Sequence, residues 1–322
     1  IGDVYKRHDL SIKAFQKCIE IMPDYAEAHL NLGLCYLLIG DYENGWKEYE
    51  WRRKLLKESH DKLSKEWSGQ NLENKTLLVL DEGSDGNLIH FIRFIRELKK
   101  EGCQVVVQCS EEARTLINNQ KWIDRAIATD EFPEHDFYIP IGSLMNVLKY
   151  NPNHHEQTFP YIEVGADKIY KNDTDLVNIG VVFETDRNSN AHNDESTEPK
   201  LFKDIFNEKH NVICLDKYVT EETLPAYCSK HISYSSLEEL SQVLNELDLI
   251  ITVDHLVAHL AGALNIDTIL MLPCVPNWRW DINFRESSVW YKSFKVIRQQ
   301  TPGDWTLVMS KLSNYLSGPK NG

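Results

Sequence analysis

A polar turn between two apolar segments is the place in this sequence where chemistry is easiest to assign. The apolar run 247–253 stops at Asp254, and His255 and His259 follow within a helical pattern of small residues. A second apolar run, 268–273, completes the order strand, turn, helix, strand, which predicts a buried parallel βαβ unit. At such a turn, backbone N–H groups and the positive end of the helix dipole converge where α/β proteins bind phosphates. The turn therefore predicts an anion site.

The same residue types also have purely structural interpretations. Asp254 follows a strand and is a favoured helix N-cap, while His259 lies on an otherwise apolar helix, where a histidine is usually a hydrogen-bonded core residue. The group Trp278, Arg279 and Trp280 either lines a ligand site or forms a packed corner in which the arginine stacks on indole. The sequence alone leaves both interpretations open.

Composition limits the classes of function. The chain has 322 residues, enough for two or three domains, with 42% hydrophobic and 26% charged residues, as is usual for a folded soluble protein. A net charge of −14 argues against non-specific binding to nucleic acid or anionic membranes. No apolar stretch is long enough to span a bilayer. Seven scattered cysteines without a C-x-x-C pair indicate a reducing, cytoplasmic setting and no structural zinc.

Residues 1–56 have the pattern of helical hairpins. Apolar residues recur at helical spacing on both sides of Pro23, and Gly33 and Gly45 lie where paired helices would cross closely. Together with Tyr36 and Tyr49, this arrangement resembles the tetratricopeptide repeat. Fewer than about three such repeats are rarely stable alone, so we expect these helices to cap an array or to pack on the domain after them.

After a polar transition at 57–74, the periodicity changes to that of an α/β protein. A buried strand at 76–80, a glycine-containing turn at 82–87 and a helix at 88–98 predict a Rossmann-like domain over 75–170. The glycines of the turn complete neither a dinucleotide fingerprint nor a P-loop, so a dehydrogenase or NTPase function is disfavoured.

A second Rossmann-like domain is predicted over 171–322. It opens with a strand at 177–183, continues through a long polar loop at 186–200, and contains the βαβ unit described above. Two such domains in sequence predict a cleft between them, with ligands at the carboxyl ends of the strands.

An ordered series of short segments resembles one family: bacterial proteins in which tetratricopeptide repeats precede a glycosyltransferase of the GT-B type, similar to the heptosyltransferases. The segments are 45–52, 67–69, 75–79, 86–91, 159–162, 247–254, 258–264, 277–280, 290–291 and 298–299. The resemblance covers nearly the whole chain. It implies an α/β fold with two Rossmann-like domains in the GT-B architecture, preceded by an α-helical repeat segment.

The resemblance implies transfer of a sugar from a nucleotide-sugar donor to a protein or glycan acceptor, with the repeats as the module that would present such an acceptor. It implies no metal and no other cofactor, because helix N-termini and basic side chains neutralise the leaving diphosphate. A carboxylate in the first glycine turn would take the proton of the acceptor. The residues that the family pattern places at the donor are Asp254, His255, His259, Trp278, Arg279 and Trp280.

The sequence departs from the family pattern where the chemistry is expected. The family has Gly-Asp in the first turn, and this chain has Gly86-Asn87, whose amide cannot accept a proton at neutral pH. Asp85, Glu82 and His90 are the nearby substitutes.

Two further departures concern the donor. The phosphate turn reads Asp254-His255-Leu256 where the family usually has Asp-Thr, and Glu195 stands where the family tends to place an arginine. The competing hypothesis is therefore a catalytically degenerate GT-B module that binds sugar or nucleotide, or acts as a scaffold, and holds a peptide partner on its repeats. An enzyme requires that Asp85, Glu82 or His90 points into the cleft between the two Rossmann-like domains, whereas a binding module does not.

Overall fold

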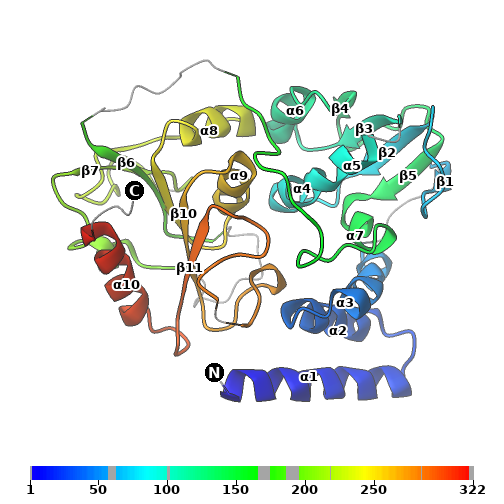
Figure 1. Ribbon diagram of the computed structural model, residues 1–322, viewed down its shortest axis with the longest axis horizontal. Helices are drawn as coiled ribbons and strands as arrows, with labels where there is room; N and C mark the ends of the chain where they lie inside the picture. Colours follow the sequence, from blue (N-terminus) through cyan, green and yellow to red (C-terminus); the bar gives the residue numbers. More distant parts are fainter. Residues whose placement is uncertain are drawn as a thin grey trace. The chain divides into compact units, whose positions relative to one another are not determined.

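The computed structural model describes residues 2–56, 63–99, 102–165, 175–185, 196–217, 219–283 and 285–318 (Figure 1). The chain forms two compact units. Unit 1 comprises Ile1–Thr158 together with Asn277–Asn283, and unit 2 comprises Phe159–Pro276 and Phe284–Gly322.

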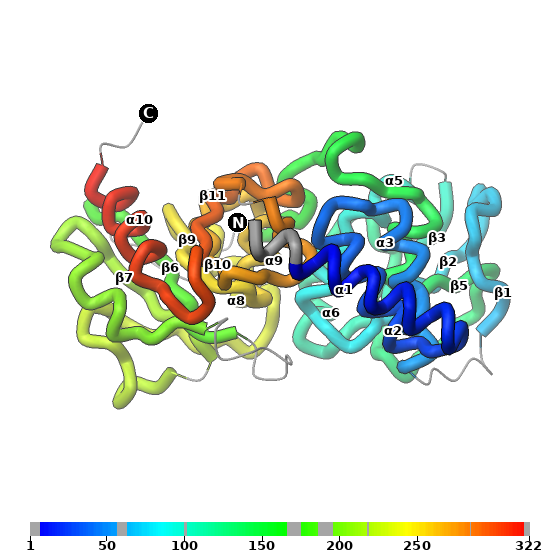
Figure 2. Tube along the Cα trace, turned by 90° about the horizontal axis from the view of Figure 1, so that it is seen from below, coloured from blue at the N-terminus to red at the C-terminus, as the bar shows by residue number. Residues whose placement is uncertain are grey.

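Unit 1 begins with the predicted helical repeat. Its elements are α1 (Gly2–Ile21), α2 (Ala26–Leu38), α3 (Tyr42–Tyr49) and the 3-10 turn η1 (Glu50–Lys54). Figure 2 shows α1 running alongside α2. The two expected glycines mark close crossings, since a Cβ on Gly33 would lie 2.8 Å from the Tyr49 nitrogen and one on Gly45 would lie 2.6 Å from Leu37.

The repeat packs on the α/β part of unit 1. The indole nitrogen of Trp46 donates to the Tyr150 carbonyl at 2.8 Å, and the Trp46 side chain is fully buried. The helices were expected either to cap an array of repeats or to pack on the domain after them, and the structure shows that they pack on this domain.

The sheet of unit 1 is parallel, with the order β1-β5-β2-β3-β4. Its strands are β1 (Lys65–Glu66), β2 (Thr76–Leu80), β3 (Gln104–Gln108), β4 (Arg125–Ile127) and β5 (Phe137–Pro140), and its helices are α4 (Asp85–Phe91), η2 (Ile92–Phe94), α5 (Ile95–Lys99), α6 (Glu111–Asn118), η3 (Ile141–Ser143), α7 (Leu144–Val147) and the distant η5 (Trp278–Trp280). The short strand β1 lies within the polar stretch 57–74, next to the buried anchor Trp67.

The first helix after β2 differs from the sequence-based prediction. It begins at Asp85 rather than at 88, because the Ser84 hydroxyl caps it by accepting a hydrogen bond from the Asn87 nitrogen at 3.4 Å. Asn87 therefore lies in the first turn of a helix and not in a loop. The expected continuous helix over 88–98 is also interrupted by the 3-10 segment η2.

Unit 2 contains a second parallel sheet, with the order β11-β10-β9-β6-β7-β8. Its strands are β6 (Val177–Val182), β7 (His210–Cys214), β8 (Lys230–His231), β9 (Leu249–Thr252), β10 (Thr268–Leu272) and β11 (Phe294–Arg298), and its helices are η4 (Pro199–Phe202), α8 (Leu237–Leu244), α9 (Leu256–Leu264) and α10 (Thr306–Ser317). The predicted βαβ unit is β9-α9-β10.

The core of unit 2 joins one face of this sheet to α10. Residues 179 and 181 of β6, 249 and 251 of β9 and 269 and 271 of β10 pack with Val308 and Leu312. These strands are buried along their length, as expected for a parallel sheet covered on both faces. Within the described ranges, no helix combines the length and the apolar content needed to cross a membrane.

Candidate functional site

The turn after β9 places three of the predicted donor residues together in unit 2. Thr252 ends the strand, Asp254 follows, and α9 begins at Leu256 with His255 as its N-cap. The Nδ1 atom of His255 accepts a hydrogen bond from the Val257 nitrogen at 3.1 Å. The residue that caps α9 is therefore His255 and not Asp254.

Asp254 and His259 form a chain of polar groups with Tyr291. The Nδ1 atom of His259 lies 2.9 Å from the Tyr291 hydroxyl, and its Nε2 lies 3.8 Å from Asp254 Oδ1. The His259 side chain is 7% exposed and that of Asp254 is 21% exposed, so Asp254 is the member of the chain that solvent reaches. The chain can orient the Asp254 carboxylate through a buried imidazole.

Tyr291 is a site residue that the chemical argument from sequence did not identify. Its ring packs over Gly262 of α9, where an added Cβ would overlap the ring. The only signal for it was the family segment 290–291. Another such segment, 159–162, lies at the other end of the helix, where the Tyr161 nitrogen donates to the Ala263 carbonyl at 3.0 Å.

A second carboxylate, Asp216, lies just beyond the carboxyl end of β7. It is 4% exposed, and its oxygens accept hydrogen bonds from the Phe183 nitrogen at 2.8 Å and the Glu184 nitrogen at 3.3 Å. Burial raises the pKa of Asp216 to about 6, and the two backbone donors and nearby His255 offset part of that rise. Asp216 was not identified from the sequence, although it comes just after the apolar run 212–215, and a carboxylate at the end of a buried strand is a recognisable signal.

The corresponding turn of unit 1, between β2 and α4, is rich in carboxylates. Asp85 is half-buried at the first position of α4, and its Oδ1 accepts a hydrogen bond from the Ser110 hydroxyl at 2.8 Å. Asp81, directly after β2, is also half-buried, and burial raises its pKa. The sequence reasoning named Asp85 and missed Asp81, although a carboxylate directly after a buried strand is a recognisable signal.

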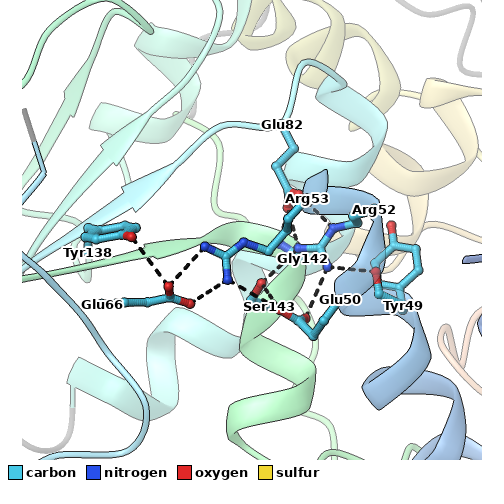
Figure 3. A network of polar contacts seen from close by, with 9 residues as sticks. All are labelled: Tyr49, Glu50, Arg52, Arg53, Glu66, Glu82, Tyr138, Gly142 and Ser143. Carbon is cyan, nitrogen blue, oxygen red and sulfur yellow. Dashed lines mark hydrogen bonds and ion pairs between the residues drawn. The ribbon is translucent and has the colours of Figure 1, made fainter. Parts of the chain in front are cut away.

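The other two substitutes for a general base are engaged in the interior of unit 1. Glu82 is held by Arg52, whose Nε lies 2.7 Å from Glu82 Oε1, and by the Gly142 nitrogen (Figure 3). His90 is fully buried, with its Nδ1 3.4 Å from an Arg93 nitrogen. Both geometries favour packing and positioning over contact with a substrate in solvent.

Asn87 stands where the family pattern has its base, and its carboxamide oxygen accepts a hydrogen bond from Arg279. Arg279 is also bonded to the Asn277 side chain at 3.0 Å, and its guanidinium lies 4.3 Å from the centre of a Trp278 ring. Arginine stacked on indole is the packed-corner geometry considered for this group. Trp280 is buried beside it.

Trp278 ties this corner to the helical repeat. Its ring meets Trp46 edge-on at 5.4 Å and stacks on Phe91 at 6.3 Å. The six predicted donor residues therefore fall into two groups: 278–280 belong to unit 1 with Asn87, whereas Asp254, His255 and His259 belong to unit 2. That all six line one cleft stays a prediction.

Glu195, which stands in the long loop where the family tends to place an arginine, lies outside the described residues. Among the residues that are described, no three His, Cys, Asp or Glu side chains gather in a way that could hold a metal ion.

Comparison with known proteins agrees with both parts of the architecture. The tetratricopeptide repeat model matches residues 14–47. No curated protein matches the chain.

Solved structures resemble the chain more widely. A family 9 glycosyltransferase from Veillonella parvula matches with a TM-score of 0.54 and 13% identity, covering 73% of this chain and 88% of that one. ADP-heptose lps heptosyltransferase II of E. coli matches with a TM-score of 0.52 and 12% identity, covering 75% and 98%. The iron-containing dodecameric glycosyltransferase TibC of enterotoxigenic E. coli matches with a TM-score of 0.49 and 12% identity over 63% of this chain, which spans 59% of its length. The chain thus has a GT-B-like fold of two Rossmann-like units, with a tetratricopeptide-like helical segment at its N-terminal end.

Proposed function

We propose that the protein is a metal-independent glycosyltransferase that moves a sugar from a nucleotide-sugar donor to a hydroxyl group of a protein or glycan acceptor. The observation that carries the proposal is the Asp254–His259–Tyr291 chain at the N-terminus of α9, in a fold of the heptosyltransferase type. One structural relative is named for ADP-heptose, so adenosine diphosphate and its sugars are the first donors to test.

In this proposal unit 2 binds the donor. The dipole of α9 and the Nε2–H group of His255 stabilise the diphosphate, because both present positive charge density at the same turn. Asp254 is a carboxylate that would repel phosphate, so we assign it to the hydroxyl groups of the donor, held in place through His259.

Unit 1 supplies the proton acceptor. The acceptor hydroxyl oxygen attacks the anomeric carbon while the bond from that carbon to the diphosphate oxygen breaks, and the electron pair leaves with the diphosphate. The hydroxyl proton passes to a carboxylate of the β2–α4 turn, for which we propose Asp85 or Asp81. The raised pKa of Asp81 suits a group that has to take up a proton.

The test starts with thermal unfolding of the chain against a panel of nucleoside diphosphates and nucleotide-sugars. A ligand at 100 times its dissociation constant adds about 2.7 kcal/mol to the free energy of unfolding. A donor that stabilises the protein is then used in a transfer assay that measures release of the nucleoside diphosphate, with and without a chelator. Activity that disappears with the chelator would contradict metal independence, and the lack of any stabilising nucleotide would overturn the donor site.

A second function, a catalytically degenerate binding module, is favoured by one observation. Asn87 occupies the position of the family base and is held by Arg279 in a bond that uses its oxygen. The variants Asp85→Asn and Asp81→Asn discriminate between the two functions. In an enzyme, loss of the general base lowers the transfer rate by about 100-fold or more, whereas a binding module keeps its nucleotide affinity and shows no transfer to lose.

A further inference from the structure

The strand order of unit 1 identifies a specific point at its carboxyl edge. From β2 the chain moves to β3 and β4 on one side, and β5 then pairs with the other side of β2. In open α/β sheets, ligands bind in the crevice outside the strand ends where the order reverses in this way. Here that point lies between Glu82, which follows β2, and Gly142 and Ser143, which follow β5.

The side chain of Arg52, from the helical repeat, occupies this point (Figure 3). Its Nε and Nη2 atoms donate to the two oxygens of Glu82 at 2.7 and 3.1 Å, and Nη2 also donates to the Ser143 hydroxyl at 2.9 Å. Glu82 Oε2 in turn accepts from the Gly142 nitrogen at 2.6 Å. One guanidinium thus bridges the ends of β2 and β5.

The same guanidinium is held on the side of the repeat. Its Nη1 donates to the Tyr49 carbonyl at 3.2 Å and to Glu50 at 3.1 Å, and Glu50 accepts from Ser143 at 2.8 Å. The Arg52 and Glu82 side chains are only 8% and 7% exposed. A buried bidentate pair of this kind is directional, and removing either partner leaves the other charge unpaired in the interior.

Local backbone packing agrees with a dedicated position for this pair. The Arg52–Glu82 pair fits against Gly142 only because this residue has no side chain. An added Cβ would lie 2.7 Å from Glu82 Oε2 and 2.9 Å from Arg52 Nη2. Burial alone would lower the pKa of Arg52, but Glu82, Tyr49 and Glu50 raise that pKa above its ordinary value, so the guanidinium stays charged.

We propose that Arg52 is a positioning residue of the acceptor half-site. It fills the crevice where the strand order reverses and fixes the β2–α4 turn, which carries Asp81 and Asp85. The repeat is then a structural part of the acceptor half-site, whatever else binds to it. The catalytic consequence rests on the function proposed above, whereas the mechanical consequence does not.

The first experiment measures the mechanical consequence by hydrogen exchange of backbone amides in Arg52→Lys. Lysine keeps the charge but cannot make the bidentate bond. We expect amides of residues 83–91 and 142–147 to exchange about tenfold faster, with no change in residues 249–264 of unit 2.

The matched control is Arg53→Lys. Arg53 is the next residue of the same turn and also forms a bidentate pair, with Glu66 at 2.7 and 3.0 Å, but this pair lies at β1 and not at the β2–α4 turn. We expect residues 83–91 to exchange in this variant as they do in the unchanged protein. Equal acceleration in both variants, or none in Arg52→Lys, would overturn the proposal. If Arg52→Lys does not fold, Glu82→Gln, which retains the shape of the partner, replaces it.

The second experiment measures the catalytic consequence with whichever nucleotide-sugar the unchanged protein uses. In Arg52→Lys we expect kcat for transfer to fall by up to about 100-fold while KM for the donor stays constant, because a misplaced turn affects the reacting geometry and not donor binding. Gly142→Ala, which disturbs the same pair from η3, directly after β5, should reproduce this result. A rise in donor KM with unchanged kcat would contradict the positioning role. If the unchanged protein transfers no sugar, the proposed function fails, and the exchange experiment alone decides on Arg52.

Discussion

The two units present the same local architecture, a parallel strand followed by a turn and a helix, with different chemistry. In unit 1, Glu82 is bonded to Arg52, Asp85 to Ser110 and Asn87 to Arg279, so the polar groups of the turn are tied to other elements of the protein. In unit 2 the turn after β9 is built around one carboxylate, Asp254, with His259 behind it.

The difference in charge is the basis for the proposed division of the reaction between the two units. Asp81, Glu82 and Asp85 give the first turn three carboxylates, of which one is neutralised by Arg52, and a diphosphate near them would be repelled. The second turn carries Asp254 together with His255 and His259 and is the better environment for an anion. In the function proposed above, the same backbone geometry therefore serves proton transfer in unit 1 and phosphate binding in unit 2, according to its side chains.

The largest expected effect concerns Asp216 and the pH dependence of stability. Its pKa is about 6 in the folded protein against an ordinary 3.8, so the folded state binds the proton more tightly than the unfolded state does. Protonation of Asp216 therefore adds to the free energy of unfolding in full below about pH 4, and this stabilisation is lost as the pH rises through about 6. The total loss is on the order of 3 kcal/mol. Urea unfolding between pH 4 and pH 7 should show this decline in the unchanged protein and not in Asp216→Asn.

Asp248→Asn is the control for that experiment. Asp248 also accepts a hydrogen bond from a strand nitrogen, that of Asn178 at 2.8 Å, but it is exposed. If the decline in stability persists in Asp216→Asn and disappears in Asp248→Asn, Asp216 is not the group responsible for the pH dependence.

The next effect concerns the packing beneath His259. In Gly262→Ala the new Cβ would overlap the Tyr291 ring, and we expect a loss of about 2 kcal/mol in the free energy of unfolding together with weaker nucleotide binding. Both are measured by denaturant titration with and without nucleotide. A second substitution, Tyr291→Leu, should recover part of the stability but not the nucleotide binding. Full recovery of both would show that Tyr291 matters only as packing.

A direct test of the contrast between the units uses one substitution in each turn. His259→Gln should weaken nucleotide binding about tenfold, because glutamine cannot donate toward Asp254 and accept from Tyr291 with the same geometry. Asn87→Ala in unit 1 should leave nucleotide affinity unchanged. Isothermal titration calorimetry measures both, and equal losses in the two variants would refute the division of labour between the turns.

The smallest effect concerns the partner of Arg279. In Asn87→Asp the present neutral acceptor becomes a charged one, and a charge-assisted bond should add about 0.5 to 1 kcal/mol to stability. The guanidinium would also hold the pKa of the new carboxyl low, which makes it a weak base. Chemical denaturation and the transfer assay check these two expectations. A large gain in transfer rate would show that a carboxylate at position 87 acts as the general base and that its replacement by Asn87 is what limits catalysis.

Sequence reasoning predicted the fold well where periodicity is strong. The strand 76–80 matches β2 to the residue, and the βαβ unit is present at β9-α9-β10. The edge strand β11 was missed, since Phe294–Arg298 carries charged residues that make it resemble a loop.

The candidate site was predictable only where its members are neighbours in sequence. Asp254 and His259 meet because five residues across a strand–helix turn bring their side chains to one end of the helix. Arg52 and Glu82 are separated by 30 residues and lie in different elements, so no local pattern signals their bond. Asp216 acquires its raised pKa from burial by the whole unit, which a single sequence does not reveal.

The short segment Asn277–Asn283 belongs to unit 1, although the chain on both sides of it belongs to unit 2. We therefore expect that neither unit can be inherited as an independent domain. Unit 2 is interrupted by residues whose burial depends on the first half of the chain, with Trp278 against Trp46 and the Ile282 nitrogen bonded to the Leu38 carbonyl at 3.2 Å. A recombination or truncation at residue 158 would leave two buried tryptophans without their native surroundings. Domain shuffling in such a lineage therefore has to carry the helical repeat and this segment together.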